Sequence, residues 1–288
     1  MADLTLARDP LPSKSWLDRF VPFGVAGAAI VTLGTWLWYT PPGLLGKADA
    51  IAFAICHRLV SHSILMGEQA MPLCARCTGI YLGALVGLIT MGGLGRGRAG
   101  GLPRRPLLLV LIAFIGIMGI DGVNSYATLL PGVPHLYEPQ NWLRLVTGTL
   151  NGLALAALIY PVLNQTMWRD WDDRPVLGRF RELGLLLAIS GVVVGLVLTN
   201  NVAILVPLAL LSVLGVLALL VALNTTILLV ALRRENRAYE ERFETYRSTL
   251  PLPWVIVGLV VTLVGGFAAG LWWLDSLIRR RHGGFRIY

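Results

Sequence analysis

Long apolar stretches dominate this sequence and constrain its fold more than any motif does. A helix needs about 20 residues to cross about 30 Å of hydrocarbon, because each residue adds about 1.5 Å along the helix axis. The sequence therefore predicts an all-α fold, a polytopic transmembrane helix bundle of about seven helices. We expect these helices near residues 20–40, 73–92, 106–123, 142–163, 183–202, 204–231 and 253–274.

The apolar run between Leu183 and Leu232 is too long for one span. It is interrupted only by the polar segment 199–201 and by Pro207, which favours a tight hairpin of two helices. A single kinked, over-long helix is the alternative, and it would leave six helices in the bundle.

Composition supports a multi-pass protein of the cell membrane, because 56% of the residues are hydrophobic and only 14% are charged. The net charge of +8 would raise the question of nucleic acid in a soluble protein. Here the basic residues lie in short loops between apolar stretches, so we expect no nucleic-acid partner. The expected partners are the lipid bilayer and, unidentified, another membrane protein or a lipid or quinone ligand.

Basic residues also predict the orientation of the bundle. Loops near 131–134 and 200–201 contain no Lys or Arg, which suits the outer face. The first apolar stretch has no cleavage pattern, so we interpret it as a retained helix with a cytoplasmic N-terminus. One observation conflicts with seven spans. The C-terminal tail would then lie outside the cell, although it contains several arginines. Four basic segments should be cytoplasmic: residues 8–19, 96–105, 169–181 and 233–247.

The chain contains only three cysteines, and all of them fall in one short stretch. The Cys3His ligand set that holds tetrahedral zinc is present here as Cys56, Cys74, Cys77 and the adjacent His57. A Cys-x-x-Cys pair is the usual half of such a site. Neighbouring residues in regular structure point in different directions, so Cys56 and His57 could bind one ion only from a turn. His62 is the alternative fourth ligand.

Pro72 is acceptable in a first helical turn, so we expect the second transmembrane helix to begin there. Cys74 and Cys77 would then share one face at the positive end of the helix dipole, which favours the thiolate. Arg76 adds positive charge beside them.

A glycine repeat follows in the same helix. Gly79, Gly83 and Gly87 recur every four residues and predict a seam where a second helix packs closely.

The predicted topology brings separated polar residues to the membrane face of the cysteine motif, which we expect to be the outer face. Asp121 comes near the end of the third helix, whereas Asn141, Arg144 and Thr147 open the fourth. An ionisable residue in a membrane segment is costly unless it is paired. We therefore predict an ion pair between Asp121 and Arg144, with either a packing or a functional role.

Three motifs of this chain resemble the signature of the prokaryotic membrane proteins grouped as domain of unknown function 2085. The resemblance covers about residues 50–165 and departs from the family in Arg58, where glutamine is common. It implies a site but no reaction, because the family has no established activity. The motifs are Cys-His (56–57), then a serine, then Pro-Leu-Cys-Ala-Arg-Cys-Thr-Gly-Ile-Tyr (72–81), Met-x-x-Asp-Gly (118–122) and Asn-x-x-Arg-x-x-Thr-Gly (141–148).

The resemblance suggests a division of the chain into three parts. These are residues 1–49 with the first helix, the core with the Cys/His motif at 50–165, and a C-terminal membrane region at 166–288.

Three functions are compatible with these residues. The zinc site could be a structural staple, or it could be catalytic, with Asp121 or Glu68 handling protons and Arg144 binding an anionic head group. The third alternative is a thiol-disulfide or quinone-linked oxidoreductase. In that case Cys74 and Cys77 would exchange, and Cys56 would be the resolving thiol.

Overall fold

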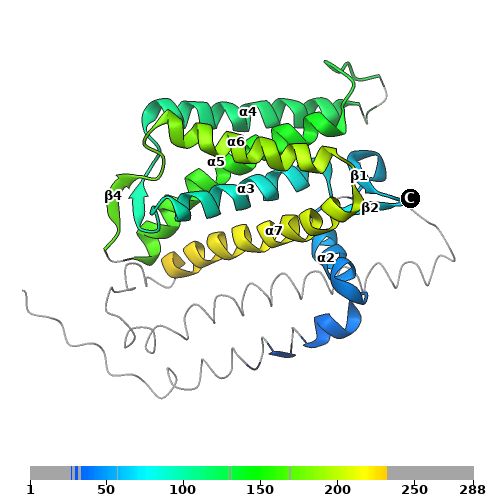
Figure 1. Cartoon of the computed structure of the whole chain (residues 1–288), viewed down its shortest axis with the longest axis horizontal. Helices are drawn as coiled ribbons and strands as arrows, with labels where there is room; N and C mark the ends of the chain where they lie inside the picture. Colours follow the sequence, from blue (N-terminus) through cyan, green and yellow to red (C-terminus); the bar gives the residue numbers. More distant parts are fainter. Residues whose placement is uncertain are drawn as a thin grey trace, which may run out of the picture.

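The computed structural model describes residues 34–56, 58–128, 130, 132–168 and 170–231, together with 27, 30 and 31. This part of the chain is mainly helical, and its long helices run side by side as a bundle with a small two-stranded sheet at each end (Figure 1). The expected helix-bundle class is therefore confirmed. The long helices are α3 (Ala75–Gly93), α4 (Arg105–Ala127), α5 (Asn141–Met167), α6 (Phe180–Leu198) and α7 (Val202–Ala231).

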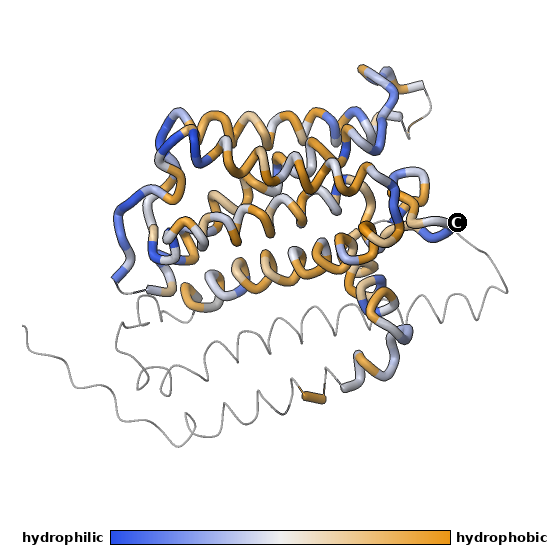
Figure 2. Tube along the Cα trace, in the orientation of Figure 1, coloured by the Kyte–Doolittle hydropathy of each residue, from blue (hydrophilic) through white to orange (hydrophobic). Residues whose placement is uncertain are grey.

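Five helices in the described ranges are long and apolar enough to cross a membrane, and they match five of the predicted spans. Figure 2 shows hydrophobic residues along these helices and hydrophilic ones gathered toward the ends of the bundle. The predicted hairpin is confirmed, because α6 ends at Leu198 and α7 begins at Val202. The single over-long helix is therefore wrong. Most of the first predicted span and all of the last lie outside the described residues.

The glycine repeat of α3 is a close-packing seam against α5, as predicted. A Cβ atom at Gly79 would lie 2.2 Å from the carbonyl oxygen of Leu145, and one at Gly83 would lie 2.4 Å from that of Thr149. From the other side, a Cβ at Gly152 would lie 2.0 Å from a backbone oxygen of α3. The two backbones are therefore in direct contact, which only glycine permits.

The two sheets are features that hydrophobic periodicity did not predict. At one end, β1 (Ser63–Met66) and β2 (Gln69–Cys74) form an antiparallel pair, with Ser63 opposite Cys74. A short helix, α2 (Gly43–Phe53), packs against β2 and α7 at this end (Figure 1). Because this sheet leads directly into α3, it determines where the cysteines lie.

At the other end, β3 (Ala99–Gly101) pairs in parallel with β4 (Asp172–Pro175). The basic segments 96–105 and 169–181 therefore meet at one end of the bundle, opposite the cysteine motif (Figure 1). The assignment of this end to the cytoplasm stays a prediction.

Candidate metal centre

The sulfur atoms of Cys56, Cys74 and Cys77 all lie within 4.8 Å of one another. Cys56 follows α2, Cys74 is the last residue of β2, and Cys77 belongs to the first turn of α3. The predicted start of this helix was wrong by one turn: Pro72 lies in β2, and Cys74 is the N-cap of a helix that begins at Ala75. Proline is tolerated in an edge strand, so Pro72 did not mark the helix start.

Cys56 and Cys74 are buried, Cys77 is half-buried, and hydrogen bonds link the three thiols. Cys56 and Cys74 are 7% and 3% exposed, and the backbone N–H of Cys74 donates to the Cys56 sulfur at 3.3 Å. Hydrogen bonds from the Cys74 and Cys77 thiols, and from the N–H groups of Cys74 and Arg58, lower the pKa of Cys56. The cluster therefore favours a thiolate at Cys56, the form that binds metal ions.

The fourth ligand expected from the sequence is not placed by the structure. His57 lies outside the described residues. Within the part of the chain that is described, no His, Asp or Glu side chain joins the three sulfurs, so the alternative ligand His62 is not part of this group. The predicted clustering of the cysteines is confirmed, whereas a role for His57 stays a prediction.

A buried carboxylate lies at the same end of the bundle. Asp121 is 1% exposed and forms an ion pair with Arg76, whose Nε lies 3.2 Å from Oδ2. The Tyr137 hydroxyl donates to the other carboxylate oxygen at 2.8 Å, and Thr147 Oγ1 lies 3.4 Å from Oδ2. The predicted ion pair between Asp121 and Arg144 is therefore wrong, because α3 directs Arg76 toward α4 and supplies the partner.

Arg144 nevertheless belongs to the same hydrogen-bonded cluster. It is 4% exposed, and it donates to Asn141 Oδ1 at 2.8 Å and to Ser125 Oγ at 3.4 Å. The same Ser125 oxygen accepts a hydrogen bond from Arg76 at 2.9 Å. Asn141 also reaches the β1–β2 sheet, because its Nδ2 donates to the carbonyl of Ser63, which pairs with Cys74. The predicted meeting of these residues at one end is confirmed.

Tyr137 closes this cluster from the segment between α4 and α5. Its backbone is held by Asn124, whose Nδ2 donates to the Tyr137 carbonyl at 2.8 Å. Burial, with the hydrogen bond to Asp121, raises the pKa of Tyr137 to about 12. The phenol therefore stays protonated at neutral pH and acts as a hydrogen-bond donor to the carboxylate.

The segment with these residues also matches known proteins. A family model described as predicted membrane protein (DUF2085) matches residues 56–158. An uncharacterized protein of Methanocaldococcus jannaschii is 30% identical over 122 residues, which cover 42% of this chain and 72% of that protein. The chain belongs to the DUF2085 family. No solved structure matches this DUF2085 protein.

Two features of this DUF2085 site were missed from the sequence. Arg76 was interpreted as positive charge beside the cysteines and not as the partner of Asp121, and the role of Tyr137 was not recognised. The sequence did contain a signal for the role of Arg76. Arg76 and Cys77 are consecutive on a helix, so the Arg76 side chain must point away from that of Cys77. No sequence pattern indicated Tyr137, since it lies in an irregular segment.

Proposed function

We propose that this protein is an integral membrane protein with a structural zinc centre held by Cys56, Cys74, Cys77 and His57. The observation that carries the proposal is the approach of three sulfur atoms to within 4.8 Å of one another. Tetrahedral zinc, with a Zn–S distance of about 2.3 Å, holds its sulfurs about 3.8 Å apart, so a small adjustment would close the site. Thiolates and imidazole are also the ligands that zinc prefers.

A structural role is supported by what the cysteines connect. They join the end of α2, the β1–β2 sheet and the start of α3, and of these α2 and the two strands are short elements. Two of the sulfurs belong to buried residues, as is usual for closed structural sites. Zinc would therefore pin the segment 56–74 to the end of the bundle.

The charges around the cluster are compatible with a bound divalent metal. Arg76 and Arg144 carry two positive charges, and Asp121 supplies the single carboxylate of their hydrogen-bonded cluster, which leaves one positive charge. Three thiolates, one neutral imidazole and Zn²⁺ together carry one negative charge. Cys74 acts electrostatically on Arg144, so a zinc-thiolate group would balance this positive charge, as a single thiolate at Cys56 also would.

A catalytic zinc centre is less well supported. A general base must have an oxygen that faces a substrate, whereas the Asp121 carboxylate is engaged by Arg76, Tyr137 and Thr147. This set of partners suits a group that fixes helix packing.

We further propose that the cysteine end faces outward and that the N-terminus is cytoplasmic, because the opposite end carries the paired basic segments.

Thiol–disulfide or quinone-linked redox chemistry is the second candidate, because the same three thiols are close together. Cys74 and Cys77 would form the exchanging pair and Cys56 the resolving thiol. The two candidates predict opposite behaviour of the thiols toward a chelator and toward a reductant, so one experiment separates them.

The test is elemental analysis of protein purified without metal-affinity resin, together with a count of free thiols. We expect about one equivalent of zinc, and three thiols that react only after chelation and denaturation. No metal, with two thiols that appear only after reduction, would reject the zinc centre in favour of the redox function.

Substitution of a ligand gives an independent check. Cys77→Ser should abolish zinc binding and lower the melting temperature in detergent, because the end of the bundle loses its cross-link. Thr90→Ser, near the other end of α3, is the matched control and should leave both quantities unchanged. A Cys77→Ser protein with normal melting would contradict the structural role.

A further inference from the structure

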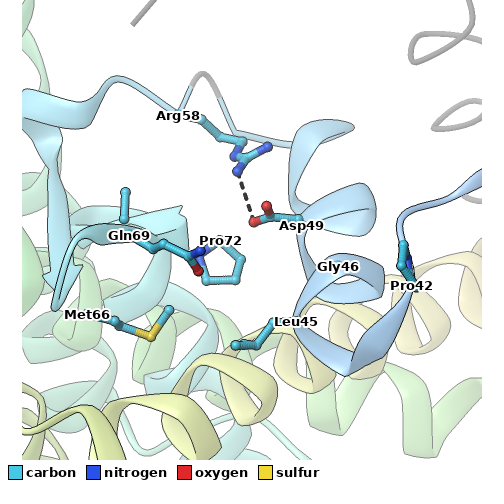
Figure 3. A pocket seen from close by; sticks show the side chains of 9 residues that line it. Pro42, Leu45, Gly46, Asp49, Arg58, Met66, Gln69 and Pro72 are labelled. Carbon is cyan, nitrogen blue, oxygen red and sulfur yellow. Dashed lines mark hydrogen bonds and ion pairs between the residues drawn. The ribbon is translucent and has the colours of Figure 1, made fainter.

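A cavity of about 470 Å³ lies between α2 and the β1–β2 sheet (Figure 3). Its size falls in the range of about 300–1,000 Å³ that is usual for ligand sites. Figure 3 shows the ion-paired Arg58 and Asp49 at one side of it and Met66 and Leu45 at the opposite side. The polar residues are Asp49, Arg58 and Gln69, and the apolar ones include Leu45, Met66 and Pro72.

The polar side of the cavity carries one charge of each sign. Arg58 Nη2 donates to Asp49 Oδ1 at 2.9 Å, and the two side chains are 31% and 42% exposed. This bond uses one of the five N–H donors of the guanidinium and one of the two carboxylate oxygens. A ligand could therefore place an anionic group beside Arg58 and an ammonium group beside Asp49 at the same time.

The two opposite charges of the cavity determine which class of ligand it can bind. A simple anion would be attracted by Arg58 and repelled by Asp49, whereas a zwitterion satisfies both. The apolar side, with Leu45 and Met66, would contact a hydrocarbon portion of the same molecule. The ligand should therefore be amphipathic, with a phosphate and an amine at its polar end.

The position of the cavity points to the source of such a molecule. The cavity lies at the end of the bundle where α3 begins, next to helices long enough to cross a membrane (Figure 1). Where such helices cross a bilayer, their ends lie at the depth of the phospholipid head groups. We propose that the cavity binds the phosphoethanolamine head group of a lipid, with the phosphate at Arg58 and the ammonium at Asp49.

Arg58 also connects this cavity to the cysteine cluster. Its backbone N–H bonds the Cys56 sulfur, and its φ of 51° lies in the left-handed region. Asparagine tolerates this backbone conformation better than most residues do, so Arg58→Asn removes the guanidinium with little backbone strain. The lipid site does not require the zinc centre, and zinc content can be measured in every variant.

The experiment titrates the full-length protein in detergent with short-chain phosphatidylethanolamine, phosphatidylcholine and phosphatidylglycerol, and counts bound lipid by native mass spectrometry. We expect phosphatidylethanolamine to bind about tenfold more tightly than the other two, which corresponds to about 1.4 kcal/mol. Arg58→Asn should remove this binding. Asp49→Asn should remove the preference for ethanolamine over choline and retain weaker binding of both.

Glu138→Gln is the matched control, because Glu138 is an exposed carboxylate at the same end of the bundle that does not line the cavity. It should bind like the unchanged protein. Equal binding of the three lipids, or an unchanged preference in Asp49→Asn, would overturn the proposal. Free phosphoethanolamine that competes as well as the lipid would overturn the assignment to a lipid. A protein with normal zinc content and no lipid selectivity would reject the lipid site and leave the zinc proposal unaffected.

Discussion

Asp121 connects three separate parts of the chain within the described cluster. Its carboxylate bonds Arg76 of α3, Thr147 of α5 and Tyr137 of the segment between α4 and α5. At this residue, therefore, one anion holds together elements that are far apart in the sequence. Removing the carboxylate would leave the Arg76 guanidinium without its counter-ion, which is more costly than losing the pair as a whole.

A double-mutant cycle in detergent should identify the partner of Asp121. We expect Asp121→Asn and Arg76→Met each to lower the free energy of unfolding, and their coupling to reach about 0.5–3 kcal/mol because the two groups touch. The cycle of Asp121→Asn with Arg144→Met is the control. Asp121 forms its ion pair with Arg76 and acts on Arg144 only over a longer distance, so the coupling with Arg144 should be smaller. A larger coupling with Arg144 would contradict the observed pairing.

The same residues show what sequence could reveal about the site. The spacing of the cysteines predicted their cluster, and the order of the spans predicted that Asp121 and Arg144 would meet at one end. The partner of Asp121 was not predictable, because it depends on how α3 is rotated about its axis. That rotation is determined by the contact of Gly79 and Gly83 with α5, a tertiary feature.

The seam between α3 and α5 is the main packing interface among the described elements. Glycines on both helices face backbone atoms of the partner, so neither helix has room for a side chain there. By contrast, α4 contacts the bundle over a smaller part of its surface, and a Cβ atom added at its Gly116 would have no neighbour within 4 Å. Glycine is therefore required in α3 and optional in this part of α4.

Gly83→Ala should separate the two helices and lower the melting temperature, because its Cβ would overlap backbone atoms of Thr149. Gly116→Ala makes the same chemical change on α4 and should leave the melting temperature unchanged or slightly higher, since alanine favours helix. Thermal unfolding of both variants in one detergent is the measurement. An equal loss in the two proteins would show that the seam is not tightly packed.

Element prediction succeeded where hydrophobic length was the signal. The five described spans and the α6–α7 hairpin follow from apolar length and from the interruption at 199–201. The strands were missed because they are short, and β3 contains only alanine and glycine. Its pairing with β4 joins chain segments separated by two whole helices, α4 and α5, and no local pattern records such a contact.

The whole molecule has two chemically different ends. One end holds the cysteines, Asp121 and the cavity beside Arg58, and the other holds the parallel β3–β4 pair and its arginines. The positive-inside rule assigns the second end to the cytoplasm. The outer face predicted for the cysteine cluster follows from this rule alone.

Cysteines introduced at exposed positions test this orientation. Glu138→Cys lies at the end with the cysteine cluster, and Asp173→Cys lies in β4 at the opposite end. An impermeant maleimide should label the first variant in intact cells and the second only after lysis. The unchanged protein, whose own cysteines are largely buried, provides the background. The reverse pattern of labelling would invert the topology.

The contact between α3 and α5 also has a consequence for biosynthesis. These helices touch along their length, yet α4 separates them in the sequence. A ribosome therefore delivers all three cysteines well before it delivers Arg144. The three sulfurs can therefore come together from one early segment, whereas Arg144 and the α5 side of the glycine seam arrive only when α5 has entered the membrane.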